Sequence, residues 1–193
     1  MKNGAIVTLA LSLLLGCSTP RVQPSGESSS ADTTAKMLER VTALSAAELD
    51  SPLLQMEIGE AFTAADDSGQ RKLVQYLYDP DAVEYALVNS GYMDGVVLQR
   101  LLGFVMDDEA RGRIAVRARA SPIRVAAAMA VRGSAVRMEV ICKSKDAAVR
   151  NAYAETLGVN ELDILWSLTS DSDCDVAAKA KRRYQELSRA RLK

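Results

Sequence analysis

The sequence predicts an all-α fold, and more specifically a short α-solenoid of stacked helix pairs. From residue 35 onward, apolar residues recur at intervals of three and four, as in Leu54, Ile58 and Phe62, which is the spacing of one face of a helix. The composition agrees, because the chain is rich in Ala, Leu, Val and Arg but has only 2 Phe and 1 Trp. A segment of the second half also recurs at a fixed interval, and this repeat is what predicts stacking.

The apolar stripes are separated by short polar segments with turn chemistry, at residues 66–69, 79–81, 89–91, 121–122 and 133–134. Ser121 followed by Pro122 predicts an N-cap and the first residue of a helix. Gly133 and Gly158 are expected to end helices, as glycine commonly does. The chain should therefore form many helices of roughly 10–15 residues joined by short loops.

The clearest internal repeat lies in the second half of the chain. The segment 123–133 lines up with the segment 149–158, which begins 26 residues later, and a fainter copy begins at Val176, a further 27 residues on. A fixed period of this size indicates stacked two-helix units. The shared alanines, such as Ala152, are expected to let neighbouring helices approach closely.

These copies resemble short bacterial HEAT-like repeats, whose helix commonly reads acid, valine, arginine, two alanines and a closing leucine-glycine. The residues that fit are Asp146, Val149, Arg150, Ala152, Ala154, Leu157 and Gly158 in one copy, and Ile123, Arg124, Ala126, Ala128 and Gly133 in the other. Pro122 replaces the acid, and the third copy lacks the arginine. The resemblance covers residues 121–190, extends back towards residue 68, and implies an α-solenoid that binds other macromolecules. The alternative is an irregular helical bundle.

The N-terminus has the pattern of a signal peptide. Lys2 precedes an apolar stretch over residues 5–15, which is shorter than the roughly 20 apolar residues that cross a bilayer. The stretch ends in Leu14-Leu15-Gly16-Cys17, which resembles the lipobox of bacterial lipoproteins. That resemblance implies cleavage before Cys17 and acylation of its thiol. By the same resemblance, Ser18 is typical of outer-membrane lipoproteins. The alternative is an ordinary secretory signal with an incidental cysteine.

The chain therefore divides into three predicted segments. Residues 1–16 are the signal peptide, residues 17–34 are the lipidated Cys17 and a tether, and residues 35–193 are the helical-repeat domain. The tether is dominated by Ser, Thr, Pro and Gly and should be a flexible linker. The expected location is the bacterial cell envelope, anchored by lipid to the outer membrane and facing the periplasm.

Several kinds of chemistry are excluded or left without support by the residues present. The chain has no histidine, which removes His-based acid–base catalysis, Ser-His-Asp triads and His-ligated zinc. Cys142 and Cys174 are too few for a metal site. They could pair in an oxidising periplasm, or Cys142 could be a buried thiol in its apolar run. We therefore predict no catalytic residue, no metal and no cofactor.

Charge is unevenly distributed along the chain. Residues 18–110 carry 6 basic and 16 acidic residues, whereas residues 111–150 carry 10 basic and 2 acidic ones. Arg113 and Arg117 lie one helical turn apart, and Arg124 and Arg150 occupy equivalent repeat positions. These four arginines are the candidate binding residues for an anionic partner. The alternative is that they pair with acids of neighbouring repeats.

The function that these observations predict is that of a membrane-anchored, non-enzymatic scaffold or adaptor that binds another envelope protein. A second hypothesis is a structural or assembly lipoprotein that contacts anionic lipid or the cell wall through its basic helices. A third is an enzyme of unknown chemistry that uses carboxylates. Nucleic acid is not an expected partner, because a lipoprotein leaves the cytoplasm.

Overall fold

The structure is a computed structural model that describes residues 30–191, so the expected signal peptide, Cys17 and most of the expected tether lie outside it. The described residues form α-helices and one 3-10 turn and contain no strand. The helices are α1 (Ser30–Ala43), α2 (Ala46–Leu49), α3 (Pro52–Ala64), α4 (Asp67–Leu73), α5 (Pro80–Asn89), α6 (Gly95–Phe104), α7 (Asp108–Arg117), α8 (Ser121–Ala130), α9 (Ser134–Lys143), α10 (Ala147–Thr156), α11 (Leu162–Leu168) and α12 (Cys174–Arg191), with the 3-10 turn η1 at Val159–Glu161.

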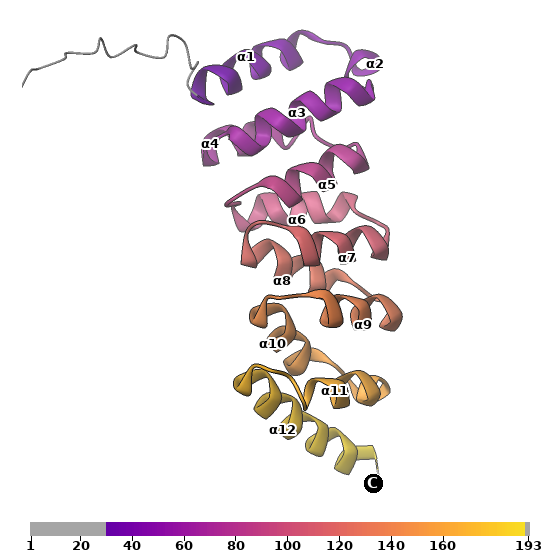
Figure 1. Cartoon of the computed structure of the whole chain (residues 1–193). Coiled ribbons are helices and arrows are strands. Elements are labelled where there is room, and N and C mark those ends of the chain that lie inside the picture. The colour runs from indigo at the N-terminus through magenta and orange to yellow at the C-terminus, as the bar shows by residue number, and fades with distance from the viewer. Residues whose placement is uncertain (1–29, 192–193) are drawn as a thin grey trace, which may run out of the picture.

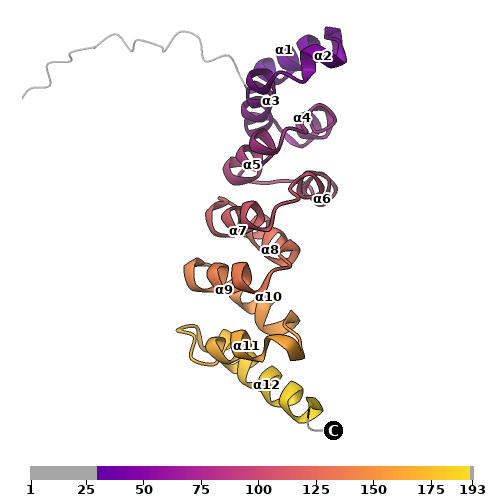
Figure 2. The same ribbon diagram turned by 90° about the vertical axis from the view of Figure 1, so that its right-hand side faces the viewer.

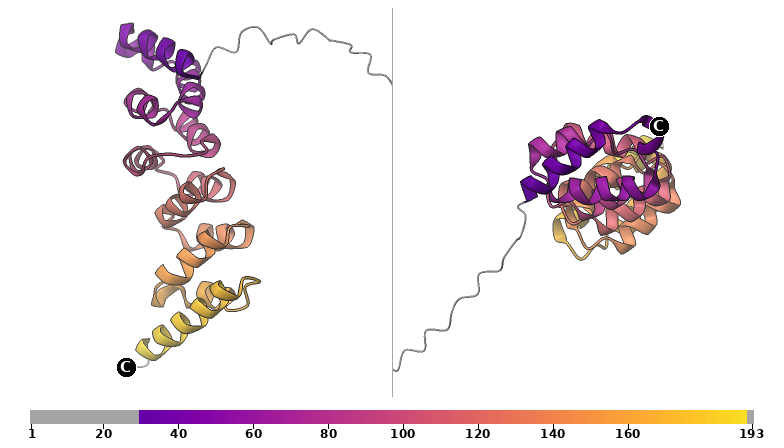
Figure 3. Two further views of the ribbon diagram at one scale, coloured as in Figure 1. Left: turned by 90° about the vertical axis from the view of Figure 1, so that its left-hand side faces the viewer. Right: turned by 90° about the horizontal axis from the view of Figure 1, so that it is seen from above.

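The helices stack in two columns, as Figures 1 and 2 show. In the odd column α3 packs on α5, α5 on α7 and α7 on α9, and in the even column α8 packs on α10 and α10 on α12. The end-on view in Figure 3 shows the helix pairs lying over one another along one axis. Each pair buries its apolar face only by packing on its neighbours. The predicted all-α solenoid of helix pairs is therefore confirmed.

The repeat period also agrees with the sequence. Helices α6, α8, α10 and α12 begin at residues 95, 121, 147 and 174, so successive starts are 26, 26 and 27 residues apart. The last two intervals are those of the sequence repeat. The first interval extends the same period back to α6, where the sequence similarity itself is no longer visible.

Three local predictions differ from the structure. Ala120, not Ser121, is the N-cap of α8, and the Ser121 hydroxyl instead donates to Asp146 Oδ2 at 2.5 Å. Gly133 and Gly158 precede helical turns, with φ values of −71° and −101°, so they do not end helices in a left-handed conformation. Gly69 lies inside α4, where a Cβ would be 2.8 Å from Thr34 Cγ2. The glycine is therefore needed for the close approach of α1 to α4 and not for a turn.

The helical domain begins earlier than expected. Helix α1 starts at Ser30, five residues before the predicted boundary at 35. Thr34 is buried against Gly69, and its hydroxyl donates to the Ser30 carbonyl at 2.9 Å. This contact with α4 orders a segment whose composition alone resembles a linker.

Both ends of the stack are closed by polar helices. Helix α1 buries only Thr34 and Val41, and the 18-residue α12 buries only Val176 and Ala180. Solenoids need such caps because an unpaired apolar face at either end would be exposed to water.

The core runs continuously from Val41 to Ala180. Ala128 and Ala154, which occupy equivalent repeat positions, are both fully buried, whereas Ala152 is only half-buried. The expectation that Ala152 is a close-packing residue is therefore wrong, and Ala154 has that role. Tyr153 is 1% exposed, and its hydroxyl donates to the Ala128 carbonyl at 2.9 Å, which ties α10 to α8.

Candidate functional site

The fourth residue of several helices is polar and bonds to the adjoining repeat. In the even column, Arg124 of α8 donates to Asp146 at 2.8 Å, and Arg150 of α10 binds Asp171 through two nitrogens at 2.7 and 3.1 Å. The two arginine side chains are only 21% and 12% exposed. They occupy equivalent positions in successive repeats, as the alignment predicts, but each is engaged within the chain. We call the Arg124–Asp146 and Arg150–Asp171 pairs the even-column ladder. This is the intramolecular alternative, so Arg124 and Arg150 would have to give up an internal carboxylate to bind a partner.

The odd column uses the same position in α3, α7 and α9, a feature that the sequence analysis missed. The Gln55 carboxamide oxygen accepts from the Tyr78 and Asp79 amides at 3.1 Å each. Arg111 donates to the Ala130 carbonyl at 3.0 Å, and Arg137 pairs with Glu161 at 2.5 Å. The sequence could have indicated these residues by their position, since each lies three residues after the first residue of its helix.

Burial and hydrogen bonding shift the pKa values of Asp146 and Asp171 in opposite directions. Burial raises the pKa of Asp146, but hydrogen bonds from Ser121, Arg124 and the Ala148 amide outweigh it, so the net pKa is lowered. Asp171 follows the same balance, with Arg150 as the principal donor. Both carboxylates are therefore ionised at neutral pH and are neutralised internally.

The internal ion pairs show which positive charges of the basic segment, residues 111–150, remain available to a partner. Six of its ten basic residues have carboxylate partners, namely Arg111, Arg113, Arg124, Arg137, Lys143 and Arg150. Within the described residues no ion pair involves the other four, and all four are exposed: Arg117, Arg119, Arg132 and Lys145. Of the four predicted binding arginines, only Arg117 is both exposed and unpaired.

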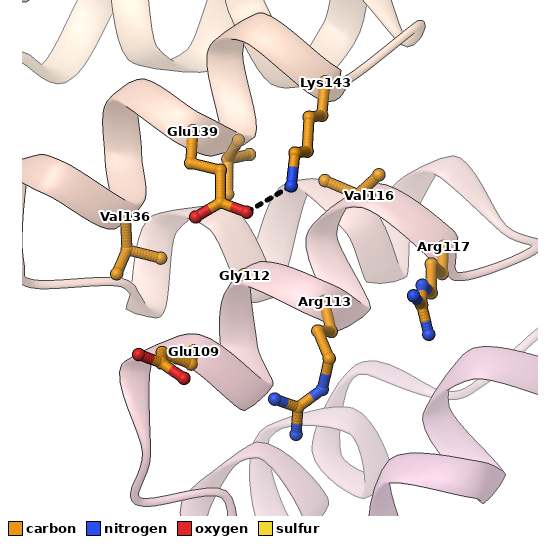
Figure 4. Close-up of a pocket in the computed structure, with 9 residues that line it drawn as sticks. Glu109, Gly112, Arg113, Val116, Arg117, Val136, Glu139 and Lys143 are labelled. Carbon is orange, nitrogen blue, oxygen red and sulfur yellow. Dashed lines mark hydrogen bonds and ion pairs between the residues drawn. The ribbon is translucent and has the colours of Figure 1, made fainter.

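A groove of about 360 Å³ lies between α7 and α9 (Figure 4). Its apolar lining is formed by Gly112, Val116, Val136 and Val140. A Cβ on Gly112 would lie 2.8 Å from Val136 Cγ1, so this glycine allows α9 to approach α7. The charged residues that line it are Glu109, Arg113, Arg117, Glu139 and Lys143.

Two neighbouring hollows extend this groove. A hollow of about 450 Å³ between α5 and α7 shares Arg113 and Arg117 with it and adds Asp81 and Tyr85. On the other side, a hollow of about 590 Å³ shares Val116 and Lys143 and reaches Lys145 in the loop between α9 and α10. We call the three together the odd-column groove. It crosses α5, α7 and α9 and is bounded at one end by Met56 of α3 and at the other by Ala147 of α10.

The charges along the odd-column groove are not equally available. Arg113 binds Glu84 through two bonds of 2.8 and 2.7 Å, and this contact raises the pKa of the Arg113 guanidinium. Lys143 pairs with Glu139 one turn away, but both side chains are more than half exposed, at 62% and 57%. Exposed pairs of this kind contribute only about 0–1 kcal/mol, so Lys143 can exchange its partner at little cost.

The described residues contain no group of three or more metal-type ligands, and none of their helices is long and apolar enough to cross a bilayer. Cys142 and Cys174 are both free and exposed, so the buried-thiol interpretation of Cys142 is wrong and the structure contains no bond between the two. Comparison with protein-family models, curated proteins and solved structures finds no match to the chain.

Proposed function

We propose that this protein is an envelope lipoprotein that acts as a non-enzymatic scaffold, and that it binds another protein along the odd-column groove. The observation that carries the proposal is the groove itself. It has apolar lining residues between charged ones, and it crosses three helices of the odd column. Protein interfaces commonly combine an apolar centre with a polar rim in this way. The membrane-anchored part of the proposal rests on the Leu14–Cys17 motif alone.

The stack is suited to this task because the groove is present in the chain without a partner. Gly112 allows α9 to approach α7, and the bonds of Arg111 and Arg137 join these helices to the Ala130 and Val131 carbonyls. A preorganised surface loses little conformational entropy when it binds, which leaves more of the contact energy for affinity.

Site-specific photo-crosslinking in intact envelopes tests the scaffold proposal. A crosslinking residue is placed in the full chain at Asp81 or at Glu139, two exposed positions in different parts of the groove. The matched control is Gln99, an exposed residue of α6 in the other column. We expect one and the same protein to be captured from both groove positions and not from Gln99. Different proteins at the two positions, or equal capture from Gln99, would refute the proposal.

The anchor is tested separately by replacing Cys17 with Ser and fractionating membranes. We expect the variant to leave the membrane fraction, because the acylated thiol is the proposed anchor. A variant that still floats with membranes at the wild-type level would show that the Leu14–Cys17 motif is not a lipobox.

The exposed bases of α12 favour a second candidate function, contact with anionic lipid or the cell wall. Lys181, Arg182 and Arg189 are all exposed. Basic residues near an anionic surface contribute about 1 kcal/mol each. Co-sedimentation of the full chain with phosphatidylglycerol vesicles, abolished by charge reversal at these three positions, would support this candidate over the protein scaffold.

A further inference from the structure

We infer that the odd-column groove binds an acidic protein segment, with its carboxylates over Arg117, Lys143 and Lys145 and its apolar side chains over Val116 and Val136. This inference rests on the proposed scaffold function and specifies the chemistry of the partner. We call the three cations the basic corner of the groove. Arg117 ends α7, Lys143 ends α9, and Lys145 follows in the next loop.

Within the described residues, Arg117 and Lys145 of the basic corner form no ion pair, and Lys143 forms one exposed pair. Asp146 lines the same hollow as Lys143 and Lys145, but its carboxylate already accepts from Ser121 and Arg124 and caps α10 through the Ala148 amide. Glu139 is the only other acid between residues 111 and 150, and it holds Lys143 through one exposed pair. A carboxylate from a partner would therefore gain contacts without competing with a buried bond.

Helix dipoles explain the positions of two of the three cations in the basic corner, but not of the third. A cation in the last turn of a helix is stabilised by the unpaired carbonyls there, which accounts for Arg117 and Lys143 separately. It does not account for Lys145, which lies beyond the end of α9. Figure 4 shows Arg117 and Lys143 on either side of Val116, so the cations of two helices border the same apolar side chain.

The mixture of apolar and acidic residues in the groove favours a protein segment over a membrane surface. Glu109 and Glu139 line the same groove as the cations and would be repelled by anionic headgroups. Val116 and Val136 are half-buried between the helices, where the side chains of a narrow segment can reach them. Packed helices lie about 8–10 Å apart, so a segment crossing α5, α7 and α9 spans about 20 Å. That length corresponds to about 6 extended residues or about 13 helical ones.

Two synthetic peptides of equal length test this inference with the full chain. One carries Glu beside Leu at each helical turn, and the other carries Lys in place of every Glu. We expect the wild-type protein to prefer the acidic peptide by about tenfold or more in titration calorimetry at low salt, with the preference falling as salt is added. The double variant Arg117→Glu with Lys143→Glu should reverse the preference.

A matched control separates the groove from general electrostatics. The double variant Lys72→Glu with Arg100→Glu makes the same change in net charge on exposed residues of α4 and α6, and it should keep the wild-type preference. Circular dichroism checks that each variant is folded. Equal affinity for the two peptides, binding of neither, or an equal loss in both double variants would overturn the inference.

Two further outcomes distinguish this inference from the proposed function. Phosphatidylglycerol vesicles that bind the wild type but not the groove variant, while the acidic peptide does not bind, would assign the basic corner to membrane contact. Capture of one protein from Asp81 and Glu139 that persists unchanged in the groove variant would leave the scaffold function standing and overturn the acidic segment.

Discussion

The two halves of the stack join their repeats with different residues at the same two positions. At the fourth residue of the even helices, α4 has the neutral Gln70, whereas α8 and α10 have Arg124 and Arg150, each paired to an aspartate. Gln70 reaches the Phe62 and Tyr92 carbonyls only at 3.5 and 3.4 Å. At this helix position the C-terminal half therefore has charge-assisted bonds and α4 has weaker neutral ones.

The second difference is the size of the residue seven positions after each helix start. It is Val74 after α4 and Leu102 in α6, but Ala128 in α8 and Ala154 in α10. Helices α8, α10 and α12 pack closely, whereas α4 and α6 make no comparable contact and leave a hollow of about 370 Å³ between them. Small residues and largely buried ion pairs thus occur together where α8, α10 and α12 pack closely. The odd-column groove lies largely beside this C-terminal half of the stack.

The largest effect that we expect comes from a charge at the close-packing position. Ala154→Asp should destabilise the full chain by several kcal/mol, because Ala154 is 0% exposed and a carboxylate there has no partner. Ala152→Asp, two residues away and half-buried, should cost less than about 1 kcal/mol. Thermal melts measure both. Equal sensitivity at the two positions would mean that α10 is rotated relative to the structure.

The next largest loss of stability should distinguish the Arg150–Asp171 ion pair from the neutral hydrogen bonds of Gln70. Arg150→Met keeps much of the side-chain volume but leaves Asp171 unpaired, so we expect a loss of about 3 kcal/mol in urea unfolding. The double variant Arg150→Met with Asp171→Leu should recover most of it. Gln70→Met, at the equivalent position in α4, should cost only about 1 kcal/mol. A larger loss at Gln70 than at Arg150 would contradict the difference between the halves.

A smaller loss of stability is expected at low pH. The pKa values of Asp146 and Asp171 are lowered in the folded chain, so their contribution to stability is fully present above the unfolded value of about 3.9 and is lost as the pH falls through the folded values. The free energy of unfolding should therefore decrease below about pH 4. The decrease should be shallower in the Arg150→Met, Asp171→Leu double variant. Parallel pH profiles for the two proteins would show that this pair does not contribute.

The fold class was predictable from the sequence because helical spacing and a 26-residue repeat are both properties of consecutive residues. The even-column ladder was also predictable, since Arg124 and Arg150 stand at aligned positions. The partners of these arginines could not be chosen, because Asp146 and Asp171 lie 22 and 21 residues away and any of several nearby acids fitted equally well.

The candidate site was predicted only in part. Charge counting selected Arg113, Arg117, Arg124 and Arg150 alike. Only the folded arrangement leaves Arg117 unpaired, adds Lys143 to the same hollow and places Lys145 in the adjoining one. The early start of α1 was hidden for a similar reason. Thr34 is ordered by its contact with Gly69, which is 35 residues away in the sequence, and composition cannot report a contact of that kind.

Hydrogen–deuterium exchange on the full chain, free and bound to the protein captured from Asp81 and Glu139, tests the central claim most directly. If the odd-column groove is the binding surface, amides of α5, α7 and α9 will gain protection on binding, while those of α6 and the outer turns of α12 will exchange as before. Protection that appears on α6 or α12 and leaves α7 and α9 unchanged would contradict the account.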